Sequence, residues 1–152
     1  LQIYFLGSRF RQVKEIRESG KNVIQDRTIY EDAHIFAENL AEMNLLSERD
    51  FKNYLSVFQL MKDFVSAPDL LIYLRADIPT LVKQIAKRGR EYETSISIDY
   101  LSKLNNKYQN WIENYKEGKL LIIDVDDLDF VEKQEDFGYI LERIDGELNG
   151  LF

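Results

Sequence analysis

The run Leu70-Leu71-Ile72-Tyr73-Leu74 decides the fold class of this chain, because its apolar residues follow one another without a polar interruption. A strand of that kind is typical of a parallel sheet whose two faces are both covered by helices. A second run, Leu120-Leu121-Ile122-Ile123, has the same character. The shorter segment Asn22–Gln25 predicts a third buried strand around Val23 and Ile24.

Helices are predicted between these strands, since apolar residues recur there at helical spacing. Gly20 and Gly89 are placed to end two of the helices. Ser47 is placed to cap the start of another helix, and Pro79 suits a first helical turn. Helices that alternate with apolar strands predict an α/β fold built on a parallel sheet. The predicted helices cover about residues 1–18, 28–43, 47–65, 79–88, 97–116 and 132–148.

Composition excludes several classes of protein. The 152 residues hold 20 Lys and Arg against 27 Asp and Glu, which gives a formal charge of −7. The absence of Cys excludes a disulfide framework and a cysteine zinc site, and the single His leaves carboxylates as the main metal ligands. The acidic balance argues against a nucleic-acid partner, and no apolar run approaches the ~20 residues of a membrane helix. We expect a cytoplasmic protein.

Polar side chains interrupt two predicted helix faces. Gln2 and Arg9 are seven residues apart, in line with the apolar stripe of the first helix. Asp32 lies at the margin of the stripe of the second helix, whereas Glu31 and the other glutamates of that helix fall on the opposite face. A buried carboxylate needs a partner, and Arg9 could pair with Asp32 in bidentate geometry.

This combination suits a flat heterocycle. A Gln amide offers one donor and one acceptor side by side, and it can present itself to adenine, guanine or cytosine. Phe36 could stack on the face of the ring. Two plainer interpretations stay open at this point: Gln2 and Arg9 could extend to solvent at the edge of their stripe, and Phe36 could belong to the core.

Charged residues follow each predicted strand, where ligands bind in open α/β sheets. They are Asp26-Arg27, then Arg75 and Asp77, then the acidic stretch Asp124–Asp127. Solvated strand ends would carry such charges without any ligand.

The densest positive patch is Lys87-Arg88-Gly89-Arg90, at the end of a predicted helix. Cations there would interact with the helix dipole, but two Arg around a Gly also suit a segment that closes over phosphates. Glu91 and Glu93, directly after it, could bind a sugar hydroxyl.

Several motifs together resemble the deoxynucleoside kinases, especially the bacterial deoxyadenosine and deoxyguanosine kinases. The run Asp26-Arg27-Thr28-Ile29-Tyr30-Glu31-Asp32-Ala33-His34-Ile35-Phe36 resembles their Asp/Glu-Arg-Ser motif and the helix after it, with Thr28 where many members have Ser. Arg88–Glu93 resembles their lid, and Leu1–Leu6 resembles the start of their substrate-binding helix. The likeness extends in the same order over essentially all 152 residues.

The resemblance implies a nucleoside site. Gln2 would bind the edge of the base, with Arg9 and Asp32 paired over it. Phe36 would stack on the base, and Glu93 would bind the 3′-hydroxyl of the sugar.

It also implies a phosphate site for ATP and Mg²⁺. Arg27 would hold the acceptor 5′-oxygen and the transferred phosphoryl group, while Asp26 would bind magnesium through water. Arg88 and Arg90, in a lid over about residues 88–97, would bind the donor phosphates. The loop with Asp126, Asp129 and Phe130 would lie against the adenine of ATP.

One part of the family pattern is missing from the sequence. The family begins with a strand, a Gly-x-x-x-x-Gly-Lys-Ser/Thr loop, a helix and a second strand that carries the general base. No such Gly-rich loop occurs in the chain. We expect residues 1–152 to be the C-terminal portion of a single kinase domain, an incomplete three-layer sandwich of the P-loop kinase type.

The implied parent enzyme moves the γ-phosphoryl group of ATP to the 5′-hydroxyl of a purine deoxynucleoside. We expect the 152 residues alone to lack this activity, and we expect a homodimer through the helices at about residues 29–64. Two alternatives are a non-catalytic fragment that binds nucleosides and dimerises, and another P-loop nucleotide kinase such as a thymidylate kinase.

Overall fold

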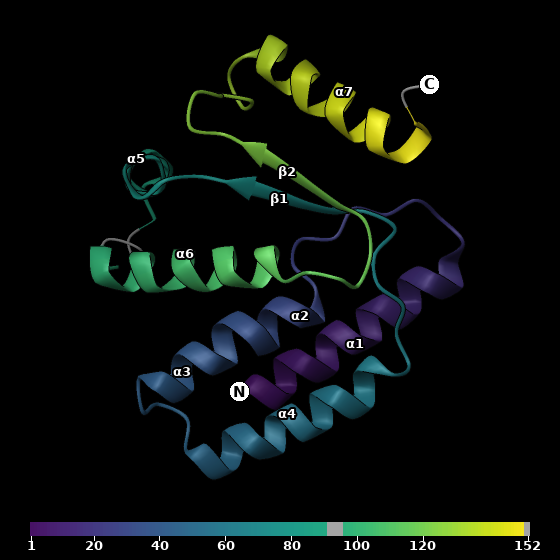
Figure 1. Cartoon of the computed structure of the whole chain (residues 1–152), viewed down its shortest axis with the longest axis vertical. Helices are drawn as coiled ribbons and strands as arrows, with labels where there is room; N and C mark the ends of the chain where they lie inside the picture. The colour runs from purple at the N-terminus through teal and green to yellow at the C-terminus, as the bar shows by residue number, and fades with distance from the viewer. Residues whose placement is uncertain (91–95, 151–152) are drawn as a thin grey trace. The chain divides into compact units, whose positions relative to one another are not determined.

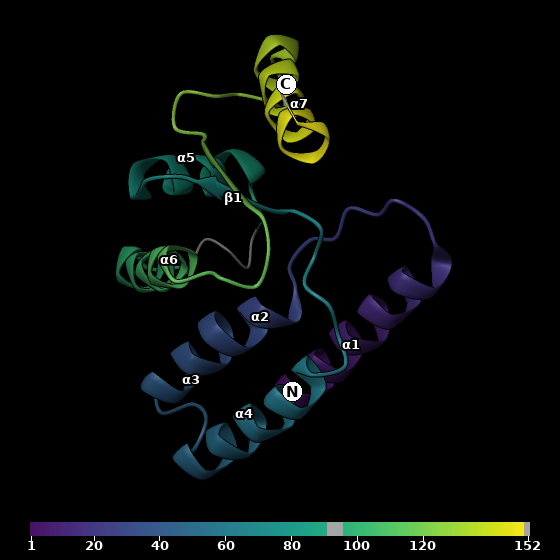
Figure 2. The ribbon, with the colours of Figure 1, turned by 45° about the vertical axis from the view of Figure 1, so that its right-hand side comes forward.

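The structure is a computed structural model, and it describes residues 1–90 and 96–150 (Figure 1; Figure 2 shows the ribbon turned by 45°). The chain divides into two compact units. The first consists of Leu1–Ser66 with Asn106–Trp111, and the second consists of Ala67–Asn105 with Ile112–Phe152. We describe each unit by itself. Among the described residues, no helix is both long and apolar enough to cross a lipid bilayer.

The first unit is helical. Helix α1 ends as predicted, because Gly20 adopts the left-handed conformation (φ 62°) that glycine accepts without strain. Helix α4 begins after Ser47, whose hydroxyl accepts a hydrogen bond from the Asp50 amide at 3.1 Å. The helices are α1 (Gln2–Ser19), α2 (Ile29–Glu31), the π-helical segment η1 (Asp32–Ala37), α3 (Glu38–Glu42) and α4 (Glu48–Lys62), and residues 106–111 of α6 (Ile98–Glu113) join them.

The helix that the sequence predicts at about 28–43 is therefore not uniform. Its middle section, η1, is wound as a π-helix, with α-helix on either side. Such wider turns are rare in proteins, and those that occur are often found at functional sites. Asp32 and Phe36, both predicted site residues, lie in this segment.

One apolar core holds the first unit together. Side chains from α1, α2, η1 and α4 meet in it, and none of its central members is more than 4% exposed. Burial of this apolar surface is the main stabilising contribution to the unit. The central members are Leu6, Ile29, Tyr30, Ala33, Ala37, Tyr54 and Phe58.

The second unit contains the sheet. Strands β1 (Leu71–Arg75) and β2 (Leu120–Asp124) pair in parallel, from Leu71 opposite Leu120 to Arg75 opposite Asp124. Asp77 caps helix α5 (Ile78–Arg88) by accepting from the Thr80 amide at 2.8 Å, and Gly89 (φ 65°) ends it. Helix α7 (Gln134–Asn149) covers β2 through a second core around Leu121, Ile123 and Ile140.

The third predicted strand is wrong. Residues 22–25 form no strand, and the side chains of Val23 and Ile24 are 49% and 98% exposed. An apolar run becomes a strand only when a neighbouring strand satisfies its N–H and C=O groups, and no described segment pairs with this one. The described sheet therefore has two strands.

Candidate functional site

Arg9 and Asp32 form an ion pair in the first unit. Arg9 Nε lies 3.6 Å from Asp32 Oδ2, and the two side chains are only 25% and 10% exposed. Arg9 Nη1 also donates to the backbone carbonyl of Asp26 at 2.8 Å, so it links α1 to the loop before α2. Sequence analysis predicted this pair from two polar residues on apolar helix faces.

Burial dominates the electrostatics of Asp32. It raises the pKa of the carboxyl group above its usual value, while the Arg9 guanidinium opposes the rise. The neighbouring Glu31 adds to the rise, and Arg27 opposes it. Because Arg9 does not fully offset the burial, Asp32 is a strong hydrogen-bond acceptor that still needs donors.

Arg27 is held in an unusual backbone conformation. It is not a glycine, yet its φ is 64°, in the left-handed region. Its guanidinium carbon lies 4.4 Å from the centre of the Phe36 ring, whose edge in turn meets Tyr108. Strained residues of this kind cluster at functional sites, where the surrounding structure holds them in place.

A capping box directly after Arg27 supplies that surrounding structure. The Thr28 hydroxyl accepts from the Tyr30 amide at 3.1 Å, and the Glu31 carboxylate accepts from the Thr28 amide at 2.9 Å and from the Thr28 hydroxyl. Glu31 is 6% exposed, so its predicted place with the other glutamates on the opposite face is wrong. The spacing Thr-x-x-Glu is a capping-box pattern, and it could have located Glu31 from the sequence.

The other predicted residues of this unit lie around Arg9 and Arg27 in the chain. Gln2 is half-buried in the first turn of α1, two turns before Arg9. Asp26 is exposed, beside Arg27. The described residues contain no group of three His, Cys, Asp or Glu that could hold a metal ion. One exposed carboxylate still fits Mg²⁺, which keeps several waters and takes its other ligands from nucleotide phosphates.

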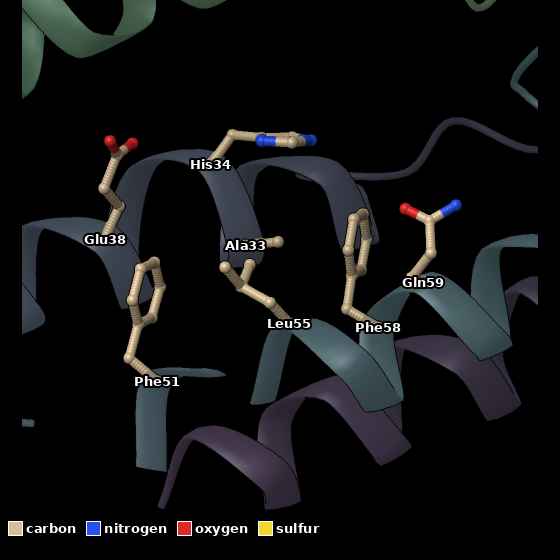
Figure 3. Close-up of a pocket in the computed structure, with 7 residues that line it drawn as sticks. All are labelled: Ala33, His34, Glu38, Phe51, Leu55, Phe58 and Gln59. Carbon is tan, nitrogen blue, oxygen red and sulfur yellow. The ribbon is translucent and has the colours of Figure 1, made fainter. Parts of the chain in front are cut away.

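A groove in the same unit involves none of the predicted site residues. Figure 3 shows it between the helical segment of Ala33, His34 and Glu38 and helix α4. His34 is exposed, and its ring meets the ring of Phe58 edge to face at 5.5 Å. The residues of α4 that line the groove are Phe51, Leu55, Phe58 and Gln59.

Charged pairs mark the strand ends in the second unit. Arg75, at the end of β1, donates two hydrogen bonds to the carboxylate of Asp124 at the end of β2. These bonds lower the pKa of Asp124 and raise that of Arg75. Asp126 accepts from the Asp77 amide at 2.9 Å. The pairs therefore hold the loops after the two strands together.

The loop after β2 is tied to the helix before the predicted lid. Lys87 Nζ lies 3.3 Å from Asp129 Oδ2 and 3.6 Å from Glu132 Oε1. The Asp129 amide donates to Asp136 at 2.7 Å. Phe130 packs against the core of the second unit, so part of this predicted adenine contact is a core side chain.

The predicted lid is described only at its start. Arg88 is the last residue of α5, and Gly89 then turns the chain toward Arg90. Glu93 lies outside the described residues, as do residues 91–95 as a whole.

Comparison with known proteins identifies the family of the chain. The profile of the family described as deoxynucleoside kinase matches residues 1–148. The chain belongs to the deoxynucleoside kinase family. It is 37% identical over 146 residues to a deoxyadenosine/deoxycytidine kinase of Bacillus subtilis, covering 95% of this chain and 67% of that protein. It is 35% identical over 161 residues to a deoxyguanosine kinase of Lactobacillus johnsonii, covering 97% and 69%.

Solved structures of the family resemble the chain as well. A deoxyadenosine kinase from M. mycoides with bound dATP matches with a TM-score of 0.76 and 29% identity, over 95% of this chain and 72% of that one. The same kinase with bound dCTP matches with a TM-score of 0.75. The chain is thus a mixed α/β member of a family of ATP-dependent phosphotransferases, and it spans about two thirds of the length of these relatives.

Proposed function

We propose that the first unit binds the deoxynucleoside acceptor of a deoxynucleoside kinase, and that this acceptor is a purine deoxynucleoside. The observation that carries the proposal is the half-buried Arg9–Asp32 pair, on whose helices Gln2 and Phe36 also lie. The pair offers N–H donors and carboxylate acceptors, Gln2 offers an amide, and Phe36 offers a ring face. These are the groups that recognise a planar base with polar edges.

Arg27 would serve the transferred phosphoryl group. No carboxylate among the described residues forms an ion pair with Arg27, and its backbone is fixed by the capping box of Thr28 and Glu31. Catalysis of phosphoryl transfer consists mainly of positioning and of charge stabilisation, for which a pre-oriented guanidinium is suited. Asp26 would hold Mg²⁺, which would neutralise charge on the nucleotide phosphates.

The second unit would contribute to ATP binding. Arg88 and Arg90 would bind donor phosphates from the lid at about residues 88–97, and Glu93 would bind the sugar 3′-hydroxyl. The loop with Asp126 and Asp129 would lie against the adenine. The ion pairs of Lys87 and the packing of Phe130 against the core hold this loop in place. The complete fold would be a three-layer sandwich of the P-loop kinase type.

A dimer through the helices at about residues 29–64 is also part of the proposal. Along α4 and the turn after it, Val57, Leu60 and Phe64 recur at helical spacing, and their exposed fractions are 39%, 65% and 80%. Exposed apolar stripes of this kind mark interaction surfaces. If this stripe forms the interface, Leu60→Glu should convert a dimer to a monomer in analytical ultracentrifugation.

A second candidate function has its own support. The 152 residues contain no Gly-rich phosphate loop, the element that cradles the β- and γ-phosphates in such kinases. We therefore propose that this chain, taken alone, binds nucleosides without transferring phosphate.

Calorimetric titration of the purified chain with deoxyadenosine, deoxyguanosine and deoxycytidine tests both proposals. We expect binding, with a purine preferred, and no ATP-dependent phosphorylation of the bound nucleoside. Gln2→Ala should change the ranking of the bases, whereas Gln84→Ala, at an exposed position of α5, should not. Failure to bind any deoxynucleoside would refute the acceptor site, and robust turnover would refute the non-catalytic role.

A further inference from the structure

Besides the amide oxygen of Asn39, two polar atoms of the first unit are buried without a hydrogen bond from the part of the chain that the structure describes. They are Asp32 Oδ2, whose Arg9 neighbour lies at 3.6 Å, and the hydroxyl of Tyr54. Tyr54 is 1% exposed and is one of the largest fully buried side chains. A buried polar atom without a partner is costly, so such atoms call for an explanation.

The two atoms lie in the same neighbourhood. Tyr54 projects from α4 into the core that it shares with Ala33, the residue next to Asp32. Burial raises the pKa of the Tyr54 hydroxyl, and the negative charge of Asp32 raises it further. Tyr54 therefore stays protonated at any physiological pH, which makes it a permanent hydrogen-bond donor.

The charged groups around Asp32 are two arginines and one glutamate. Arg9 approaches from α1, Glu31 precedes Asp32 in the same helical stretch, and Arg27 lies in the loop before it. Arg9 is 3.6 Å away, too far for a good hydrogen bond. A phenol O–H adds a hydrogen bond without adding charge, so it can stabilise the carboxylate without competing with Arg9 for it.

We propose that Tyr54 is a positioning residue for Asp32: its O–H turns to donate to Asp32 Oδ2, and it holds the carboxylate ionised and aimed for the nucleobase. This inference rests on the proposed acceptor site. Tyr54 itself would touch no substrate, since it lies in the core. The carboxylate would then keep its other lone pairs for Arg9 and for an amino group of the base.

The first test needs no ligand. The pKa of Asp32 is measured by NMR titration of its carboxyl carbon in the wild-type chain, in Tyr54→Phe and in Tyr30→Phe. Tyr30 is a matched control, because it is a buried tyrosine of the same core. Loss of a donor to the charged form raises a carboxyl pKa, so Tyr54→Phe should raise that of Asp32 by about one unit, and Tyr30→Phe should leave it unchanged. Equal values in all three proteins would overturn the contact.

The second test measures deoxyadenosine and deoxyguanosine affinity from pH 3 to pH 8, a range that begins below the ordinary pKa of an Asp carboxyl and extends above it. Affinity should fall at acid pH, where Asp32 becomes protonated. In Tyr54→Phe this acid limb of the pH profile should lie about one pH unit higher, so that affinity at a given pH on the limb should be about tenfold lower. In Asp32→Asn the limb should vanish, and adding Tyr54→Phe to it should have no further effect.

A uniform loss of affinity at all pH values, shared with Tyr30→Phe, would show that Tyr54 is only a core residue and would overturn the proposal. Absence of binding by the wild-type chain would refute the acceptor site instead, and the NMR titration would still decide whether Tyr54 serves Asp32.

Discussion

Two Arg–Asp pairs of the molecule behave in opposite ways. Arg9 and Asp32, in the first unit, have side chains that are 25% and 10% exposed, and the pKa of Asp32 is raised. Arg75 and Asp124, in the second unit, are 47% and 62% exposed, and the pKa of Asp124 is lowered. The same two residue types therefore carry a costly charge in one unit and a well-solvated charge in the other.

The difference teaches what each pair is for. Hydrogen bonds from Arg75 are the largest influence on Asp124, and they make the pair a clamp between two strand ends. Burial is the largest influence on Asp32, and no described residue donates a hydrogen bond to its Oδ2. A carboxyl group whose pKa is shifted by burial is a feature of functional sites.

The largest expected effect is on the free energy of unfolding when the arginine of each pair is removed in turn. Arg9→Ala should lower the free energy of unfolding by about 2 kcal/mol at pH 7, because Asp32 would stay buried without its nearest cation. Arg75→Ala should leave that free energy unchanged within experimental error, because exposed pairs contribute little. Urea unfolding at pH 7 measures both, and equal losses would remove the distinction between the pairs.

A smaller effect on stability is expected at Arg27 and Gly89, one in each unit, because both have a left-handed backbone conformation. Arg27 (φ 64°) and Gly89 (φ 65°) have nearly the same φ, and no described atom beyond the chain neighbours of Gly89 would lie within 4 Å of a Cβ atom there. Backbone strain, and not a steric clash, should then determine the stability of a variant at Gly89. Arg27→Gly should be more stable than Arg27→Ala by about 1 kcal/mol, and Gly89→Ala should lose a similar amount.

Thermal unfolding of the three variants and the wild type checks this prediction. An Arg27→Ala protein as stable as Arg27→Gly would mean that the backbone at this position is not strained.

The smallest expected effect is on the pH dependence of stability, which should have opposite signs for Asp32 and Asp124. The folded-state pKa of Asp32 is raised, so ionisation of Asp32 costs stability, and the cost grows as pH rises above 3.8 through that pKa. The pKa of Asp124 is lowered, so its contribution is present above 3.8 and is lost as pH falls below it. Relative to Asp32→Asn, the wild type should thus lose stability with rising pH, and relative to Asp124→Asn it should gain. If the stability difference between the wild type and each Asn variant changed with pH in the same direction, the opposite pKa shifts of Asp32 and Asp124 would be contradicted.

Much of the local structure could be predicted from the sequence. Gly20 and Gly89 end helices, Ser47 caps one, and both long apolar runs form parallel strands. These features depend on a few neighbouring residues, and glycine conformation, capping side chains and apolar continuity determine them locally.

The predictions that were wrong have two kinds of cause, which are a missing distant partner and an overlooked local cap. Val23 and Ile24 have the composition of a strand, but no described segment pairs with them. Glu31 has the charge of a surface residue, but the capping box buries it. The π-helical winding of η1 has no counterpart in the hydrophobic pattern, and this segment contacts both α1 and α4.

The sequence by itself determined the kind of protein: an acidic α/β chain with the Asp-Arg-Thr and Arg-Gly-Arg motifs of a deoxynucleoside kinase. It also indicated that Arg9 and Asp32 could pair, because each interrupts an apolar stripe. Only the tertiary structure decided that burial outweighs Arg9 at Asp32, and that the buried Tyr54 hydroxyl has no hydrogen bond to a described residue. The physical reason is that desolvation depends on every element packed around a charge, and those elements come together only in the folded chain.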